Sequence, residues 1–287
     1  MTEKNKNYPL KHLISSHNIV PQRKMGQNFL FDFNILRKIA NTAGSLYGVT
    51  VIEVGPGPGN LTQILLELGA KKVIAIEKDR QFLPVLEKIA LRYPNQLEII
   101  QDNALLVDFQ KISNLQPPVR IISNLPYNIG TRLFFNWITS PVWPPCWESM
   151  TLMFQKEVGQ RIIAQRNDPN YGRLSVLTGW RTKSRIVFDI PPHVFFPSPK
   201  ITSSLVNFIP HLKPIPCCLE SIKKITQEAF GKRRKTLRQS LKNLGGEDLL
   251  AKAGIKSNLR AENLSVEEFC HITNIFSQKS NTCSQTN

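Results

Sequence analysis

The chain has 287 residues and a formal charge of +16, with 37 Lys and Arg against 21 Asp and Glu. At roughly 150 residues per domain this length predicts about two domains, and the 41% hydrophobic content excludes a wholly disordered protein. No apolar run approaches the roughly 18 residues of a membrane helix, and the polar residues 1–10 do not resemble a secretory signal. We therefore expect a cytoplasmic protein without membrane association. The positive charge favours a polyanionic partner.

The five cysteines are an odd number and include no Cys-x-x-Cys pair. Neither a disulfide framework nor a structural zinc site is therefore predicted, and reduced thiols are expected. The five histidines are scattered without the spacing of metal ligands. We expect no metal.

The first two-thirds of the chain alternates two patterns. Short β-branched runs at 49–54, 72–76, 97–100, 119–122 and 150–154 are separated by segments with helical periodicity, such as 61–68 and 82–91. Such units form a parallel sheet with helices on both faces. After a helical stretch around 160–162, runs at 184–190 and 203–209 predict an antiparallel pair at the sheet edge, which gives a mostly parallel α/β sheet of seven strands.

Composition changes at 210–216, where three prolines fall in seven residues. Beyond this linker the pattern is helical only, with helices predicted at 219–230, 235–243, 247–253 and 265–276. Ser265 and Glu268 predict a capping box for the last helix. The predicted organisation is an N-terminal extension (1–21), an α/β domain (22–210), a small helical domain (217–276) and a disordered polar tail (277–287).

Polar residues stand at the carboxyl ends of four consecutive predicted strands. The first strand runs into the turn Gly55-x-Gly57-x-Gly59, and the next three end at Glu77, Asp102 and Asn124. In an open parallel sheet, ligands bind at this edge. The sequence therefore predicts a ligand site built from a glycine turn, two carboxylates and an amide.

The glycine turn favours a nucleoside ligand without phosphates. It lacks the third glycine of the Gly-x-Gly-x-x-Gly dinucleotide motif, and Pro56 and Pro58 remove two N–H donors that a pyrophosphate would use. Glu77 lies at the offset of an acidic residue that binds ribose hydroxyls, and Asp102 can accept from an adenine amino group. Ribose and adenine without phosphate describe S-adenosylmethionine, whose sulfonium suits an acidic pocket.

The segment Asn124-Leu125-Pro126-Tyr127 suits an exocyclic adenine amine as the methyl acceptor. The Asn124 oxygen and a backbone carbonyl, that of Leu125 or Pro126, can accept the two hydrogens of the amine, and Tyr127 can stack on the base. In-line approach to a methyl group is then mainly a matter of positioning, and no charged general base is required.

A basic stretch follows in the predicted helical domain. Residues 221–260 hold 11 Lys and Arg against 3 Asp and Glu, which is half of the excess charge. Spacings of three and four place several of these residues on one face of the predicted helix 235–243. We interpret the cluster as a phosphate clamp on folded RNA, which positions the substrate without reading its sequence; its members are Lys232, Arg233, Arg234, Lys235, Arg238 and Lys242.

Taken together, these motifs closely resemble the KsgA-type rRNA adenine dimethyltransferases. The resemblance extends from Gln22 to Phe276 in the family's order, and its motifs are Gln27-Asn28-Phe29-Leu30, the glycine turn, Glu77, Asp102-Asn103-Ala104, Asn124-Leu125-Pro126-Tyr127-Asn128, Gln155-Lys156-Glu157-Val158, Tyr171-Gly172-Arg173-Leu174-Ser175, Phe195-x-Pro197-Ser198-Pro199-Lys200 and Arg233-Arg234-Lys235-Thr236-Leu237.

The resemblance implies a Rossmann-like class I methyltransferase fold and N6,N6-dimethylation of two adjacent adenosines in a hairpin loop near the 3′ end of 16S rRNA, with S-adenosylmethionine as donor and no metal. It also implies a role in late small-subunit biogenesis, and we expect a monomer. The implied cofactor contacts are Asn28, Leu30, Gly55, Glu77, Asp102 and Asn124. The implied contacts to the target adenine are Asn124, Leu125, Pro126, Tyr127 and Phe195.

Several alternatives stay open at this point. Phe196 competes with Phe195 as the second stacking ring, and the substrate is either naked rRNA or an assembled subunit. A related methyltransferase of large-subunit rRNA, of the antibiotic-resistance type, would share the strand-end residues. A ribosome-assembly or transcription factor on the same fold would need no catalysis.

Overall fold

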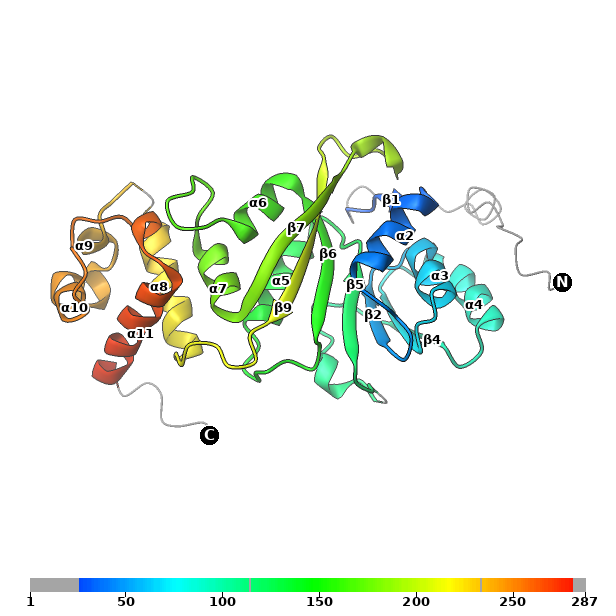
Figure 1. The fold of residues 1–287 in the computed structure, drawn as a ribbon, viewed down its shortest axis with the longest axis horizontal. Helices are drawn as coiled ribbons and strands as arrows, with labels where there is room; N and C mark the ends of the chain where they lie inside the picture. Colours follow the sequence, from blue (N-terminus) through cyan, green and yellow to red (C-terminus); the bar gives the residue numbers. More distant parts are fainter. Residues whose placement is uncertain (1–25, 114, 233, 281–287) are drawn as a thin grey trace. The chain divides into compact units, whose positions relative to one another are not determined.

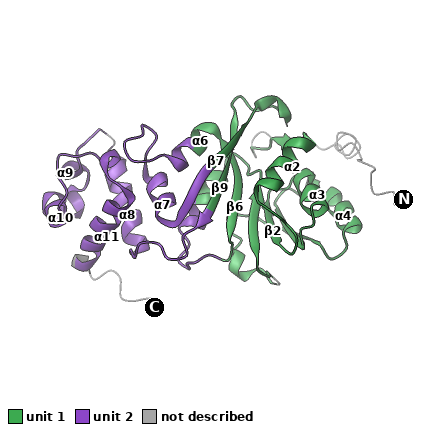
Figure 2. Ribbon diagram, in the orientation of Figure 1, with its two compact units in different colours: residues 1–134, 146–159, 186–208 green, residues 135–145, 160–185, 209–287 purple. Residues whose placement is uncertain are grey.

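The computed structural model describes residues 26–113, 115–232 and 234–280. The N-terminal extension predicted for residues 1–21 lies outside the described residues. The chain folds into two compact units (Figure 2). The first unit contains the described residues up to Phe134, together with Cys146–Gly159 and Ile186–Phe208. The second contains Phe135–Pro145, Gln160–Arg185 and the described residues from Ile209 onward.

A seven-stranded sheet with the order β4-β3-β2-β5-β6-β9-β7 confirms the predicted mostly parallel architecture (Figure 1). β2 pairs in parallel with both β3 and β5, β4 and β6 extend the parallel set, and β9 pairs antiparallel to β6. The strand bounds are β2 Thr50–Val54, β3 Lys72–Glu77, β4 Leu97–Gln101, β5 Val119–Ser123, β6 Ser149–Gln155, β7 Thr182–Ile190 and β9 Ser203–Pro210.

The order of the strands sets the position of the ligand site. β2 lies between β3 and β5, so the chain reverses its direction of winding next to β2. Ligands of open α/β sheets bind at this switch point, outside the carboxyl ends of the strands. β2 and β3 are buried almost throughout, as expected of central strands covered on both faces.

The helices α2 to α6 follow the strands in the expected alternation, and the last parts of α5 and α6 belong to the second unit. α2 begins after Asp32, whose carboxylate accepts hydrogen bonds from the Asn34 and Ile35 backbone N–H groups at 2.9 and 3.1 Å. The bounds are α2 Phe33–Thr42, α3 Asn60–Glu67, α4 Leu83–Arg92, α5 Gly130–Ile138 and α6 Lys156–Ile163, with 3₁₀ turns η2 Arg80–Phe82, η3 Phe109–Lys111 and η4 Pro192–Val194. The apolar faces of α2, α3 and α4 and residues of the sheet form one buried cluster.

A two-stranded antiparallel sheet stands apart from the main one. It pairs β1 (Phe29–Leu30) with β8 (Phe195–Phe196), so that Phe29 faces Phe196 and Leu30 faces Phe195. The sequence pattern does not predict it. It fixes the segment after Gly26 to a part of the chain that lies more than 160 residues later.

The second unit is built mainly from helices around their own buried cluster. Its elements are α7 Arg173–Arg181, α8 Leu219–Gly231, α9 Leu237–Ser240, η5 Lys242–Leu244, α10 Gly246–Lys252, η6 Ala261–Asn263 and α11 Val266–Ser280. The predicted capping box of α11 is confirmed, because Ser265 Oγ accepts from the Glu268 N–H at 3.2 Å and Glu268 Oε2 accepts from the Ser265 N–H at 2.7 Å. α7 packs against α8 and α11, so this unit includes residues that precede the proline-rich linker.

Three expectations need correction. The predicted helix 235–243 is wrong: α9 has only four residues, and after it the chain forms the 3₁₀ turn η5 and reaches Gly245 with a φ of 112°. The first N–H groups of α9, those of Leu237 and Arg238, donate to the loop carbonyls of Leu259 and Ser257. The predicted tail begins too early, because α11 continues to Ser280. Residues 281–287 lie outside the described residues. Cys218 is disulfide-bonded, so the thiols are not all reduced as expected, whereas Cys146, Cys217 and Cys270 are free.

Candidate functional site

The turn between β2 and α3 has a backbone that requires glycine. Gly55, Gly57 and Gly59 have φ values of 68°, 55° and 84°, in the left-handed region. A Cβ atom at Gly57 would lie 2.6 Å from the Phe29 ring, and one at Gly55 would lie 3.1 Å from Pro126. The turn is therefore compact and brings backbone close to the end of the neighbouring strand β5.

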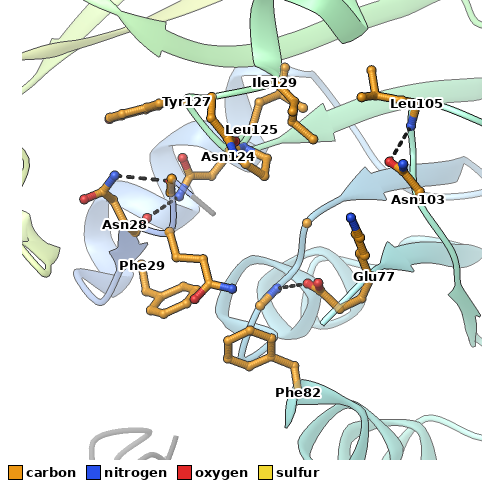
Figure 3. A pocket seen from close by; sticks show the side chains of 17 residues that line it. Asn28, Phe29, Glu77, Phe82, Asn103, Leu105, Asn124, Leu125, Tyr127 and Ile129 are labelled. Carbon is orange, nitrogen blue, oxygen red and sulfur yellow. Dashed lines mark hydrogen bonds between the residues drawn. The ribbon is translucent and has the colours of Figure 1, made fainter. Parts of the chain in front are cut away.

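Glu77 braces this turn from the end of β3 (Figure 3). Its carboxylate accepts hydrogen bonds from the Gly57 N–H at 3.0 Å and from the Asp79 N–H at 2.8 Å. The side chain is 6% exposed. Burial raises the pKa of Glu77, and the two backbone bonds oppose that rise. The carboxylate thus holds the glycine turn and also borders the adjoining cavity.

A cavity of about 170 Å³ opens where these strands end (Figure 3). It contains most of the residues that the sequence predicts. Its lining comprises Gly26, Gln27, Asn28, Phe29, Gly55, Gly57, Glu77, Lys78, Phe82, Asn103, Leu105, Asn124, Leu125, Pro126, Tyr127, Asn128 and Ile129.

The segment 26–31 forms one wall of the cavity and is attached at several points. The Asn28 carbonyl accepts from Asn124 Nδ2 at 2.9 Å, and the Leu30 carbonyl accepts from Asn60 Nδ2 at 2.7 Å. Gln27 Nε2 donates to Asp79 Oδ2 at 2.9 Å. These bonds link the segment to the ends of β3 and β5 and to α3, and they explain why it belongs to the site.

The Asn124 amide has a defined orientation. Because its Nδ2 donates to the Asn28 carbonyl, Oδ1 is the amide atom that remains to accept from a ligand. The Pro126 carbonyl already accepts from the N–H groups of Ile129 and Gly130, at 3.1 and 2.8 Å, where α5 begins. Of the two backbone acceptors left open by the sequence, the Leu125 carbonyl is therefore the better candidate.

Three predicted site residues do not line the cavity. Asp102 is exposed, and its Oδ1 accepts from the Asn103 N–H at 2.6 Å. Leu30 is buried and contributes its carbonyl to Asn60. Phe195 is 4% exposed within the apolar core.

Sequence reasoning missed Asn103 and Leu105, which do line the cavity. Both residues lie in the loop that follows β4, and Asn103 comes directly after the predicted site residue Asp102, so their position in the sequence could have indicated them.

Comparisons with known proteins place this site in a family. The model of the ribosomal RNA adenine dimethylases matches residues 20–278. The chain belongs to this family. Ribosomal RNA small subunit methyltransferase A of Agrobacterium fabrum is 57% identical over 93% of this chain and 96% of its own length, and its Rhizobium meliloti counterpart is 58% identical over the same shares.

Among solved structures, a dimethyladenosine transferase from Plasmodium falciparum has 26% identity and a TM-score of 0.74, covering 88% of this chain and 98% of its own. The 23S rRNA methyltransferase ErmE has 22% identity and a TM-score of 0.64, covering 88% of this chain and all of its own, which shows a shared fold. These structures confirm the predicted class I methyltransferase fold. The family match and the small-subunit relatives support the rRNA adenine dimethyltransferase prediction over the large-subunit and assembly-factor alternatives.

The predicted RNA-binding residues of this dimethylase lie around α9. Lys235 precedes the helix and Lys242 lies in the 3₁₀ turn after it, so they do not share one helix face with Arg238 as predicted. Arg238 Nη1 lies 3.9 Å from Glu247 Oε2, with both side chains more than half exposed. Arg233 lies outside the described residues, whereas the remaining members of the cluster are exposed: Lys232, Arg234, Lys235, Arg238 and Lys242.

Among the described residues, no group of three or more His, Cys, Asp or Glu side chains could hold a metal ion. Within the same part of the chain, no helix is long and apolar enough to cross a membrane.

Proposed function

We propose that the protein transfers methyl groups from S-adenosylmethionine to N6 of two adjacent adenosines in the hairpin loop near the 3′ end of 16S rRNA, within the small ribosomal subunit. One observation carries the proposal: the Asn124 amide is held in one orientation by its hydrogen bond to the Asn28 carbonyl, and it borders the cavity that the glycine turn and Glu77 also line. The relatives named small subunit methyltransferase A support the choice of subunit. The protein acts as a cytoplasmic monomer in late subunit biogenesis, without metal or membrane.

The residues present fit the methyl donor. Gly55 and Gly57 line the cavity and carry no side chain, so a ligand can lie against the backbone there. Glu77 and Asn103 supply polar groups at the wall, and Phe29, Phe82 and Leu105 supply apolar ones. Of the predicted cofactor contacts, Asn28, Gly55, Glu77 and Asn124 border the cavity and would hold the donor, which supplies an electrophilic methyl group on its sulfonium when bound.

Asn124 and Leu125 prepare the amine. The nitrogen lone pair of an adenine amine is delocalised into the ring, which makes it a weak nucleophile. Asn124 Oδ1 and the Leu125 carbonyl accept the two hydrogens of the amine and favour tetrahedral geometry at nitrogen. Their fixed positions also orient the amine for in-line attack, which lowers the entropic part of the barrier.

Aromatic rings hold the flipped base. Tyr127 borders the cavity and can stack on adenine, a contact worth about 1–3 kcal/mol in single-strand binders. Phe195, the ring implied by the family motif, lies in the core, while Phe196 is 54% exposed and packs edge-on against Phe31 at 6.3 Å between ring centroids. Phe196 is therefore the better candidate for a second base contact. Extrusion of an adenine costs a few kcal/mol and is least costly in a loop.

The α/β domain of residues 22–210 carries the chemistry, and the helical domain of residues 217–276 carries the RNA contacts. The exposed basic cluster around α9 can neutralise phosphates without reading sequence. Binding by such contacts weakens steeply with salt. Recognition of one hairpin then depends on the shape of the RNA and of the subunit around it.

The test uses tritiated S-adenosylmethionine and small subunits that lack adenine dimethylation. We expect dimethyladenosine at the 3′-end hairpin, loss of label in Asn124→Ala, and normal label in Asn136→Ala, which changes an exposed asparagine on α5. Label only on large-subunit RNA offered in parallel would contradict the proposed substrate. Label that persists in Asn124→Ala would contradict the proposed role of that amide.

A further inference from the structure

The Tyr127 ring is not fixed by packing alone. Its side chain is only partly buried and borders two cavities, the one of about 170 Å³ described above and a second of about 20 Å³. The second cavity is lined by Leu125, Tyr127, Gly130, Thr131, Met153, Phe154, Gln155 and Val158. A partly buried ring beside a cavity is held less firmly by packing than a ring in the core, so a hydrogen bond to its hydroxyl can define its orientation.

Ser203 supplies such an anchor. The Tyr127 hydroxyl and Ser203 Oγ form a hydrogen bond. Ser203 is 0% exposed and begins β9, where it pairs with Gln155 at the end of β6. Its position is therefore set by the main sheet. Burial raises the pKa of the Tyr127 phenol, and the hydrogen bond to Ser203 opposes that rise.

The neighbouring hydroxyl serves a different purpose. Ser204 Oγ donates to Asp189 Oδ1 at 2.6 Å, and Asp189 Oδ2 accepts from Lys156 Nζ at the same distance. This network links β9, β7 and the start of α6 and has no bond to Tyr127. Successive residues of one strand point to opposite faces of the sheet, so Ser203 and Ser204 are neighbours in the sequence but have different contacts. Ser204 is therefore a suitable control for Ser203.

We propose that Ser203 is a positioning residue for methyl transfer, which holds the Tyr127 ring in the plane that stacks on the target adenine. This inference rests on the proposed function of Tyr127. Ser203 touches neither the base nor the donor and acts only through the tyrosine hydroxyl. Removal of either hydroxyl therefore has one and the same effect on catalysis.

The experiment is a double-mutant cycle with Ser203→Ala, Tyr127→Phe, the double variant and Ser204→Ala as control. We expect each single variant to lower kcat/KM for undermethylated small subunits by about three- to tenfold, the equivalent of one hydrogen bond. The double variant should lose no more than the larger single loss. The affinity of Tyr127→Phe for S-adenosylmethionine should stay at the wild-type value, as should kcat/KM of Ser204→Ala.

Two results would overturn the inference: a Ser203→Ala variant as active as wild type, or losses that multiply in the double variant. An NMR measurement separates this failure from failure of the proposed function. With tyrosine labelled at Cζ with carbon-13, the Tyr127 signal is the one absent from Tyr127→Phe. It should shift in Ser203→Ala and not in Ser204→Ala, whether or not the wild-type protein labels any subunit.

Discussion

Glu53 gives the stability of this protein a pH dependence that can be worked out from the structure. It lies at the penultimate position of β2, is 2% exposed, and accepts a hydrogen bond from Thr62 Oγ1 at 2.6 Å. Burial raises the pKa of the carboxyl from 4.5 to about 8; the Thr62 bond lowers it and nearby Glu77 raises it further. At neutral pH the folded protein therefore holds Glu53 mostly protonated, whereas the unfolded chain ionises it.

The direction follows from proton linkage. Between about pH 4.5 and pH 8 the folded state binds one more proton than the unfolded state, so stability falls as pH rises through this window. The contribution of the protonated Glu53 side chain to the free energy of unfolding is fully present at pH values below the pKa of this carboxyl in the unfolded chain. Within this window the free energy of unfolding falls by about 1.4 kcal/mol per pH unit, which gives a loss on the order of 3 kcal/mol at pH 7.

Glu53→Gln should remove this loss, because the amide is neutral at every pH and its oxygen can still accept from Thr62. Urea unfolding followed by tryptophan fluorescence at pH 5, 6, 7 and 8 measures the difference from wild type. We expect a difference near zero at pH 5 that grows in favour of Glu53→Gln toward pH 8. Glu87→Gln, an exposed change on α4, is the control and should show no such trend. A constant difference between pH 5 and pH 8 would refute the reasoning.

Three further predictions concern ligands. Gly57→Ala should weaken S-adenosylmethionine binding at least about tenfold by calorimetry, because the new Cβ meets Phe29 at 2.6 Å and φ is +55°; unchanged affinity would contradict a close approach there. Lys242→Gln should lower the slope of log affinity for small subunits against log salt by about 0.7–0.9, and an unchanged slope would exclude a phosphate contact. Phe196→Ala should reduce rRNA methylation without changing the melting temperature, whereas Phe195→Ala, a core change, should destabilise by about 3–5 kcal/mol; the reverse pattern would restore Phe195 as the stacking ring.

The sequence predicts the main sheet and the ends of its strands well, and the reason is physical. Buried parallel strands read as continuous apolar runs, and each run ends where the chain must become polar. Residues such as Glu77 and Asn124 are therefore located by the strands that precede them. Parallel pairing then brings them to one edge, and the cavity contains both.

What the sequence does not predict is contact between distant short segments. β1 and β8 have two residues each, too few for a periodic signal, and their pairing is set by tertiary contacts. The carboxylate of Glu77, expected to bind ribose, also accepts a hydrogen bond from the Gly57 N–H. A pattern of residue types does not predict this second role. In the predicted helix 235–243, the first N–H groups of α9 donate to the carbonyls of a distant loop, at Leu259 and Ser257, and the chain turns into a 3₁₀ segment after Ser240.

These unpredicted contacts explain how a short motif becomes a defined site. Asn124 carries the chemistry proposed here, but its amide is oriented by the carbonyl of Asn28, which is 96 residues away in the chain. Asn28 is in turn held because β1 pairs with β8 and because Asn60 binds the Leu30 carbonyl. A change that weakens this attachment would leave every motif residue in place and still allow the amide to rotate. The orientation of Asn124 is therefore a property of the folded segment 26–31 as much as of the motif that contains it.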